Sequence, residues 1–435
     1  MAPPKGGFAP SLEKFLDTLK SRPVEASVEL LISLLKRRQI KGSEPCAIAT
    51  AHILLQVVAK DKWNDVDQLL GRVQLIGRKL VAAQPRELVI GNIVRRVLGL
   101  IRDEAEEDRN DGNDGQSDVA SEIPPPVTSV ASGGGGDSPS KPMRPPILAN
   151  LGTFARTQSM FNLLSDPDTA PVVWSNGSTP RLGSGASTPL AHAQSTNLYS
   201  FRSEVIDGIE EIMDEIKQVD EQIQAYSDIT VHPGDYILVH QPSRTVQKYL
   251  ARAASKRRFT VFLTVDPCAS LASEDPYASF RKSMASGGAT VISVLNAGLT
   301  AYMSRVNKVI LGARAITGKG GVIVDAGAAT IARAAHEQGR TVIVLGGVYT
   351  LSPESHFQEA LIEWGDPSKY VNFADGSMVS QVKVKSAVSE FLPGDHVDTY
   401  ITNLGAHTRD HLHTLIMDHY KEEDIAFDFH SKMQR

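Results

Sequence analysis

The stretch from Val306 to Ala328 reads VNKVILGARAITGKGGVIVDAGA and says most about the fold. Its pattern predicts a buried strand, a turn, a glycine-rich loop and the start of a helix. Such a βα unit is typical of an open α/β sheet, in which ligands bind beyond the carboxyl ends of the strands. The loop at 317–321 is nevertheless followed by the apolar run 322–324. The place where reactive side chains are expected therefore carries few of them.

Apolar runs without alternation lie on both sides of this stretch. We expect strands at 236–240, 259–265, 289–295, 306–311 and 341–345. Ser243 is a suitable N-cap for a helix that ends at Arg257. Continuous apolar runs are typical of strands covered on both faces, and their alternation with helices predicts a doubly wound, Rossmann-like parallel sheet. We assign this α/β domain to residues 229–425 and a tail to residues 426–435.

The amino-terminal part has the period of helices instead. Apolar side chains share one face in five successive segments between residues 11 and 105, which predicts an all-α domain over residues 8–105. A long connecting helix is expected at 201–228. Its apolar heptad seam consists of Val205, Ile209, Ile212, Ile216, Val219 and Ile223. Such a seam packs either onto the chain's own domain or against a coiled-coil partner.

Residues 106–200 have a different composition. Carboxylates crowd residues 103–118, prolines follow, and glycines fill positions 133–136. Chains of this kind bury too little apolar surface to offset the entropy of ordering, so we expect a disordered, low-complexity linker. A short apolar segment near 151–165 is expected to dock as a helix. Thr179 and Thr188, each followed by proline, are candidate phosphorylation sites.

Bulk properties limit the classes of protein. The 435 residues are too many for one ordinary core. No apolar run reaches 18 residues, and the amino terminus lacks the apolar region of a secretory signal. Two cysteines fit a reducing compartment without disulfides. A formal net charge of −5 argues against general nucleic-acid binding. We therefore expect a cytosolic protein that has neither a membrane segment nor a nucleic-acid partner.

Familiar nucleotide-binding motifs are absent or altered. A phosphate-binding loop has four residues between its first glycine and Gly-Lys, and then Ser or Thr. Here five residues separate Gly312 from Gly318-Lys319, and Gly320 follows. After the first expected strand, residues 240–244 replace the glycine-rich dinucleotide motif. No nucleotide cofactor is therefore expected.

Two further groups of residues suggest chemistry only weakly. His407 and His411 have the spacing of two metal ligands on a helix, with Asp410 and His413 nearby, but a polar solvent-facing surface explains them as well. Cys268 lacks a basic neighbour that would activate its thiol. We expect neither a metal site nor a reactive cysteine.

Four short motifs resemble the regulatory subunits of eukaryotic translation initiation factor 2B. They are Ser243-Arg244-Thr245-Val246, residues 304–312, Leu351-Ser352-Pro353 and residues 401–405. The resemblance covers residues 10–105 loosely and 201–425 well. It implies a fold related to the isomerases that act on methylthioribose 1-phosphate and ribose 1,5-bisphosphate.

The resemblance also implies that the catalytic groups of those isomerases are replaced. Their Gly-Ala-Asp-Arg motif corresponds to residues 312–315, which places Arg314 at the catalytic aspartate. Their His-Cys-Asn motif corresponds to residues 240–242, which places Gln241 at the cysteine. Glutamine does not titrate and arginine stays protonated, so a proton-transfer pair is missing. The expected remnant, a vestigial pocket or an interface without catalytic residues, cofactor or metal, consists of His240, Gln241, Arg244, Gly312, Arg314, Gly320, Gly321 and Asp325.

The function implied by the resemblance is that of a non-catalytic regulatory subunit in the guanine-nucleotide exchange factor complex for translation initiation factor 2. The implied partners are the alpha, gamma, delta and epsilon subunits of a heterodecamer, with direct pairing to delta. The complex binds the alpha subunit of factor 2 and senses its phosphorylation in the integrated stress response. A single chain is then expected to expose an apolar patch.

Two alternatives use the same fold. An active sugar-phosphate isomerase would need a replacement acid or base near Gly312 and Gly234, for which Asp235, Asp266 and Asp325 are the available carboxylates. A metabolite-binding module would keep the pocket and bind without reacting.

Overall fold

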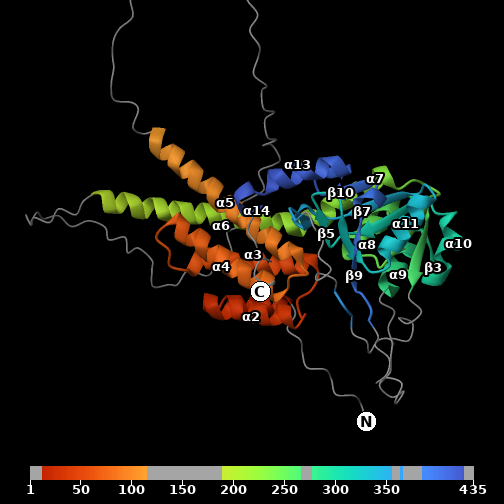
Figure 1. Cartoon of the computed structure of the whole chain (residues 1–435), viewed down its shortest axis with the longest axis horizontal. Coiled ribbons are helices and arrows are strands. Elements are labelled where there is room, and N and C mark those ends of the chain that lie inside the picture. Colours follow the sequence, from red (N-terminus) through yellow and green to blue (C-terminus); the bar gives the residue numbers. More distant parts are fainter. Residues whose placement is uncertain (1–11, 115–188, 266–276, 355–362, 366–384, 426–435) are drawn as a thin grey trace, which may run out of the picture. The chain divides into compact units, whose positions relative to one another are not determined.

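The computed structural model describes residues 12–114, 189–265, 277–354, 363–365 and 385–425 (Figure 1). The chain forms two compact units, residues 1–108 with 190–435 and residues 109–189. Apart from residues 109–114 and 189, the features described below belong to the first unit. The predicted segment near 151–165 and the two threonines before proline lie outside the described residues. The predicted domain boundaries stay predictions.

Helices make up the amino-terminal region and flank the sheet. They are α1 (Leu12–Leu19), α2 (Val24–Lys36), α3 (Ser43–Lys60), α4 (Val66–Ala83), α5 (Leu88–Asp114), α6 (Pro189–Ala225), α7 (Ser227–Thr230), α8 (Arg244–Lys256), α9 (Ala278–Ser286), α10 (Leu299–Met303), α11 (Ala328–Glu337), α13 (Arg409–His419) and α14 (Glu422–Ile425). Ser243 caps α8 as expected, since its side chain accepts a hydrogen bond from the backbone N–H of Val246. No described helix is both long and apolar enough to cross a membrane.

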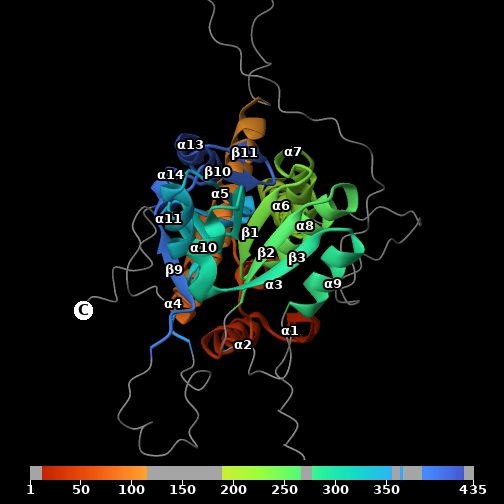
Figure 2. The same ribbon diagram turned by 90° about the vertical axis from the view of Figure 1, so that its right-hand side faces the viewer.

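The strands form two sheets. They are β1 (Tyr236–His240), β2 (Thr260–Val265), β3 (Thr290–Leu295), β4 (Lys308–Gly312), β5 (Ala315–Thr317), β6 (Val322–Asp325), β7 (Thr341–Leu345), β8 (Leu351–Ser352), β9 (Ser389–Leu392), β10 (Thr399–Thr402) and β11 (Gly405–His407). The larger sheet has the order β11-β10-β7-β4-β1-β2-β3, and all its pairs are parallel except β10 with β11. Helices lie on both sides of it, α8 and α9 on one and α10 and α11 on the other (Figure 2). The prediction of an all-α region followed along the chain by a doubly wound, Rossmann-like sheet is confirmed.

The connection after β4 differs from the expected direct βα unit. Strands β5 and β6 form an antiparallel hairpin inside a second, four-stranded sheet, and only then does α11 begin. Side chains on one face of the hairpin, Ile316 and Val322, join the main core. Those on the other face, Ala315 and Ile323, cluster with Leu88 of α5. The apolar residues after the glycine loop are thus buried on both faces because the helical region covers the second one.

The expectation that every strand is covered on both faces is wrong for β3. This strand lies at the edge of the large sheet, and Ile292 is 38% exposed and Leu295 57% exposed. The apolar pattern alone does not distinguish an edge strand from a central one.

The heptad seam of α6 packs within its own unit. All six seam residues are buried, at 0–7% exposure. The helix is also tied to its neighbours by polar contacts, because the Arg96 guanidinium of α5 bonds the Glu215 carboxylate at 2.7 Å. No apolar seam therefore remains on the described part of α6 for a coiled-coil partner.

Candidate functional site

Six of the eight predicted site residues, all except Gly320 and Gly321, lie near the point where the winding of the sheet reverses. His240 ends β1 and Gly312 ends β4, and these two strands are paired at the centre of the sheet. Successive strands run outward from β1 in one direction and from β4 in the other. Ligands of doubly wound proteins bind at such a reversal, beyond the carboxyl ends of the strands. These predicted residues therefore lie where a ligand site of such a sheet is expected.

His240 is buried and held by hydrogen bonds on both ring nitrogens. Nδ1 lies 2.6 Å from the hydroxyl of Thr264, and Nε2 lies 2.8 Å from the carbonyl oxygen of Ala326. The ring packs against Gly327, whose φ of +102° favours glycine and where an added Cβ would lie 2.9 Å from Nε2. The imidazole therefore fixes the loop before α11, with no ring nitrogen left for a ligand.

This packing predicts that Gly327→Ala destabilises the protein by about 1–3 kcal/mol, through backbone strain and the contact with His240. Gly71→Ala in α4 is the control, because nothing lies within 4 Å of an added Cβ there and alanine favours a helix by up to about 1 kcal/mol. Urea unfolding followed by circular dichroism measures both. Equal stability of the two variants would contradict the prediction.

The other residues after β1 and β4 are less enclosed. Gly312 allows the close approach of Ser243, since a Cβ there would lie 2.6 Å from the serine Oγ. Gln241 is exposed and has a φ of +41°. The Arg244 side chain is 70% exposed and reaches a carboxylate oxygen of Glu44 only at 3.8 Å.

Arg314 forms the centre of an ion-pair cluster. Its Nε and Nη2 donate to one carboxylate oxygen of Asp325, at 2.9 and 2.6 Å. Its Nη1 donates to Glu363 at 3.1 Å. Burial lowers the pKa of the guanidinium, but its carboxylate neighbours raise it further, so the net shift is upward. The Arg314 guanidinium is thus fully engaged with the chain's own carboxylates.

The helical region supplies the rest of this cluster. Arg38, just after α2, pairs with Glu363. The Ser43 hydroxyl, at the start of α3, donates to the Arg314 carbonyl oxygen at 2.9 Å. Arg38, Glu87 and Glu363 are not among the residues predicted from the sequence, because no motif marks them and they come from segments far apart in the chain. The cluster joins the helical region to the sheet at the candidate site.

Glu87 lies close to Arg314 and is almost completely buried. Burial raises the pKa of its carboxyl group, and the attraction of Arg314 offsets this only in part. One of its oxygens accepts the backbone N–H of Gly42 at 3.2 Å. Because the pKa is higher in the folded protein, the protonated form of Glu87 favours folding. This contribution to stability is fully present at pH values below the pKa that Glu87 has in the unfolded chain. It is lost as the pH rises through the higher pKa that Glu87 has in the folded chain.

We therefore expect Glu87→Gln to raise the free energy of unfolding at pH 7, with a difference from the parent chain that shrinks toward pH 4. The amide oxygen keeps an acceptor for Gly42 and removes the buried charge. Glu29→Gln, at an exposed position of α2, is the control and should give no such pH dependence. Urea titrations at several pH values measure the effect. A loss of stability for Glu87→Gln at pH 7 would show that its charge is needed by Arg314.

The amino terminus of α11, a place where phosphate groups commonly bind, is occupied by a side chain. A Glu390 carboxylate oxygen accepts the backbone N–H groups of Gly327 and Ala329, at 2.8 and 2.6 Å. These donors and the positive end of the helix dipole attract anions. Here the anion is supplied by β9, so a phosphate would have to displace a carboxylate.

Gly320 and Gly321 do not join the Arg314 cluster. They form the turn of the β5–β6 hairpin, where Gly320 has a φ of +82° and its carbonyl oxygen accepts the Tyr400 hydroxyl at 2.6 Å. A Cβ on Gly321 would lie 2.3 Å from the ring of Phe391. Both glycines permit close packing at the other end of the hairpin.

Asp235 and Asp325, the two described carboxylates among those considered for an isomerase, lie at different ends of the sheet. Asp235 precedes β1, at the amino end of the sheet, and binds Lys308 at 2.6 Å. Asp266 and Cys268 lie outside the described residues. Of the two described carboxylates, Asp325 stands at the switch point, bound to Arg314.

The histidine pair is close but is not on one helix as expected. His407 ends β11 and His411 lies in α13, with their Nδ1 atoms 3.1 Å apart. Burial lowers the pKa of His407. In the part of the chain that the structure describes, no three His, Cys, Asp or Glu residues are grouped to hold a metal ion.

A doubly wound parallel sheet with a hairpin after its fourth strand and a helical region bound at its switch point defines a Rossmann-like α/β protein. The chain belongs to the initiation factor 2 subunit family, whose model matches residues 39–409.

Individual members of this family are similar to the chain over nearly its whole length. It is 30% identical to translation initiation factor eIF2B subunit beta of Schizosaccharomyces pombe, over 94% of this chain and 99% of that protein. The crystal structure of eIF2B beta from Chaetomium thermophilum is 41% identical, with a TM-score of 0.67, and covers 97% of this chain and 99% of that one. A chain of the tetrameric eIF2B-beta2-delta2 complex of the same organism is 38% identical, with a TM-score of 0.64, over 94% of this chain and 100% of that one. The resemblance to initiation factor 2B, and to its beta subunit in particular, is confirmed.

The chain is also similar in sequence to sugar-phosphate isomerases. Ribose 1,5-bisphosphate isomerase of Pyrococcus furiosus is 24% identical over 218 residues, which are 50% of this chain and 66% of that enzyme. The chain is therefore a translation initiation factor subunit by family, built on a fold that it shares with isomerases.

Proposed function

We propose that this chain is a non-catalytic regulatory subunit of the guanine-nucleotide exchange factor for translation initiation factor 2 and acts in the cytosol. It pairs directly with a delta subunit and assembles with alpha, gamma and epsilon subunits. Within that assembly it helps bind the alpha subunit of factor 2 and sense its phosphorylation. The observation that carries the proposal is the match over nearly the full length to beta subunits, one of them in a complex with delta.

An uncovered apolar surface supports the pairing. On one face of the large sheet, Tyr236 stacks on Phe262 at 5.8 Å between ring centroids, and Tyr302 of α10 lies 5.6 Å from the same ring. Ile292 pairs with Phe262 in register on β3. Three members of this group, Tyr236, Ile292 and Tyr302, are 42%, 38% and 37% exposed. We call Tyr236, Ile292 and Tyr302 the edge patch. Grouped exposed aromatic and aliphatic side chains mark protein-binding surfaces.

The Arg314 cluster supports a role without catalysis. An isomerase needs a group that gives and takes a proton beside its substrate. At this switch point Arg314 is held by two carboxylates and His240 by two hydrogen bonds, while Glu390 fills the nearby helix terminus. These contacts are suited to holding the helical region and the sheet together.

Affinity purification of the tagged full-length chain from its own cells, with mass spectrometry of the bound proteins, tests the proposal. We expect alpha, gamma, delta and epsilon subunits together with initiation factor 2. Recovery of the chain alone, or as a self-dimer, would overturn it.

A metabolite-binding module is the second candidate, because the isomerase relationship spans half of the chain. It predicts a saturable rise in melting temperature with ribose 1,5-bisphosphate. That rise should be lost in Gln241→Ala, whose side chain is exposed at the switch point. No shift at millimolar ligand would remove this candidate.

A further inference from the structure

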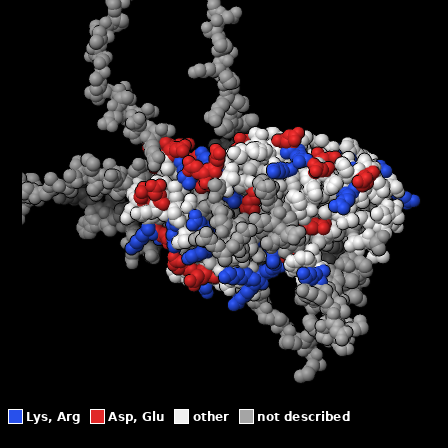
Figure 3. Space-filling view, in the orientation of Figure 1, with Lys and Arg blue, Asp and Glu red and all other residues white. Residues whose placement is uncertain are grey.

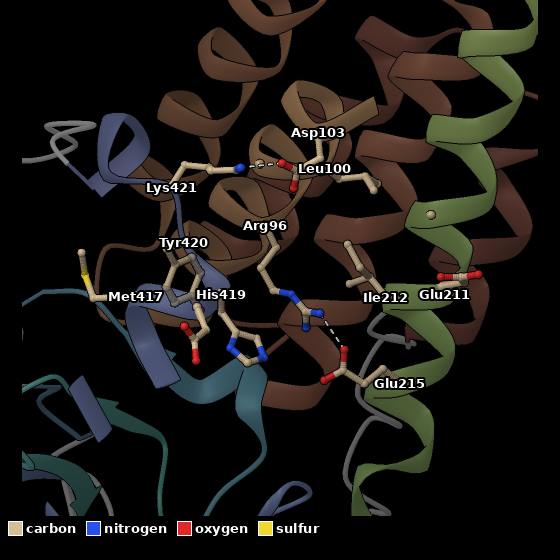
Figure 4. Close-up of a pocket in the computed structure, with 13 residues that line it drawn as sticks. Arg96, Leu100, Asp103, Glu211, Ile212, Glu215, Met417, His419, Tyr420 and Lys421 are labelled. Atoms are coloured by element: carbon tan, nitrogen blue, oxygen red, sulfur yellow. Dashed lines mark hydrogen bonds and ion pairs between the residues drawn. The ribbon is translucent and has the colours of Figure 1, made fainter. Parts of the chain in front are cut away.

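A second concave site lies away from the sheet, where three helical segments meet. A cavity of about 620 Å³ opens between α5, α6 and the end of α13 (Figure 4). Its apolar wall consists of Leu100, Ile212 and Met417. Gly99 of α5 and Gly208 of α6 also line the cavity, and Gly208 lets Leu100 pack closely against α6, since an added Cβ there would lie 2.7 Å from the leucine Cδ1. The volume lies within the range of sites that enclose a small molecule or a few side chains of a partner.

The charged groups in the cavity are unbalanced. Four carboxylates and two cations line it. Arg96 pairs with Glu215 at 2.7 Å, and Lys421 pairs with Asp103 at 2.5 Å, as the dashed lines in Figure 4 mark. The remaining carboxylates, Glu211 and Asp418, are exposed and form no ion pair within the described residues. Figure 3 shows Asp and Glu side chains gathered where α5, α6 and α14 lie in Figure 1. The cavity is therefore suited to a cation.

Two polar atoms in the cavity wall are available for hydrogen bonds with a ligand. The Nδ1 of His419 donates to the carbonyl oxygen of Leu415 at 2.7 Å, which leaves Nε2 of the neutral ring as an acceptor. The Nη1 of Arg96 is buried and has no hydrogen-bond partner, and Figure 4 shows its guanidinium between His419 and Glu215. A buried donor without a partner is unfavourable, so an incoming acceptor would be stabilised there.

We propose that this cavity binds a basic peptide segment of a partner protein. An arginine or lysine stem covers the apolar wall, and its charged head reaches Glu211 and Asp418. A backbone carbonyl of the same segment accepts from Arg96 Nη1. A peptide provides the cation, the aliphatic stem and the acceptor together, whereas a polyamine lacks the acceptor. This inference does not depend on the proposed function, because it is tested on the chain alone.

The test uses fluorescence anisotropy with the purified full-length chain and a fluorescein-labelled, amidated octapeptide of alternating Arg and Ser. We expect saturable binding that weakens about tenfold in Glu211→Gln/Asp418→Asn, because two charge-assisted contacts are lost. Met417→Trp, at an exposed position, should also block binding by filling the cavity without a change of charge. Glu221→Gln/Glu337→Gln removes the same charge from exposed positions outside the cavity and should bind as the parent chain does.

Each other outcome overturns the proposal. Equal weakening by both double variants would show general attraction to an acidic protein. Spermine binding that is tighter than that of the peptide, with the same dependence on Glu211 and Asp418, would assign the cavity to a free polyamine. Absence of saturable peptide binding would leave the cavity without this role.

Discussion

Arg314→Ala should destabilise the chain by about 2–4 kcal/mol. Breaking a buried ion pair costs about 3–5 kcal/mol, because the remaining charge has lost its partner. Arg314 is 29% exposed, so the expected loss lies somewhat below that range. The substitution leaves Asp325 without its only described ion partner and Glu363 with Arg38 alone. Urea unfolding followed by circular dichroism and fluorescence gives the free energy.

Two further variants identify the cause. Arg314→Ala/Asp325→Asn should recover part of the loss, because it removes the carboxylate left uncompensated. Arg333→Ala, at an exposed position of α11, should change stability by less than about 0.5 kcal/mol. Strictly additive losses in the double variant would mean that Arg314 acts by packing. At pH 4 the deficit of Arg314→Ala should shrink, since carboxyl groups without a cation have raised pKa values and become neutral as the pH falls.

Ile292→Asp should weaken pairing with a delta subunit at least about 30-fold. A residue at the centre of an interface commonly contributes 2 kcal/mol or more to the binding free energy. A carboxylate buried there would be desolvated without gaining a hydrogen-bond or ion-pair partner. Ile292 belongs to the edge patch and pairs in register with the buried Phe262, so the new charge would stand within this apolar surface. Co-expression with delta, followed by titration of the purified chains, measures the affinity.

Leu75→Asp is the matched control. Leu75 lies on α4, is 46% exposed and gains the same charge. It should leave pairing unchanged, and the melting temperature of each variant alone shows whether folding is retained. If Leu75→Asp abolishes pairing and Ile292→Asp does not, the surface for delta lies on the helical region.

The sequence by itself determined the class of fold and the place of the candidate site. Apolar runs of five or six residues between helices specify a parallel sheet, and Ser243 specifies the start of α8, because these are local properties of the chain. The order of the strands then places His240 and Gly312 together. The resemblance that predicts replaced catalytic groups at Gln241 and Arg314 also depends on local sequence, and that replacement stays a prediction.

Only the tertiary structure decided what surrounds those residues. The cluster around Arg314 includes Arg38, Glu87 and Glu363, which come from segments far apart in sequence. No local sequence pattern predicts that these segments pack together. The same holds for β3, whose apolar residues resemble those of a central strand but lie at an edge, and for the hairpin that the helical region covers. Ion-pair partners and exposure depend on which elements pack together, and that packing is a property of the whole folded chain.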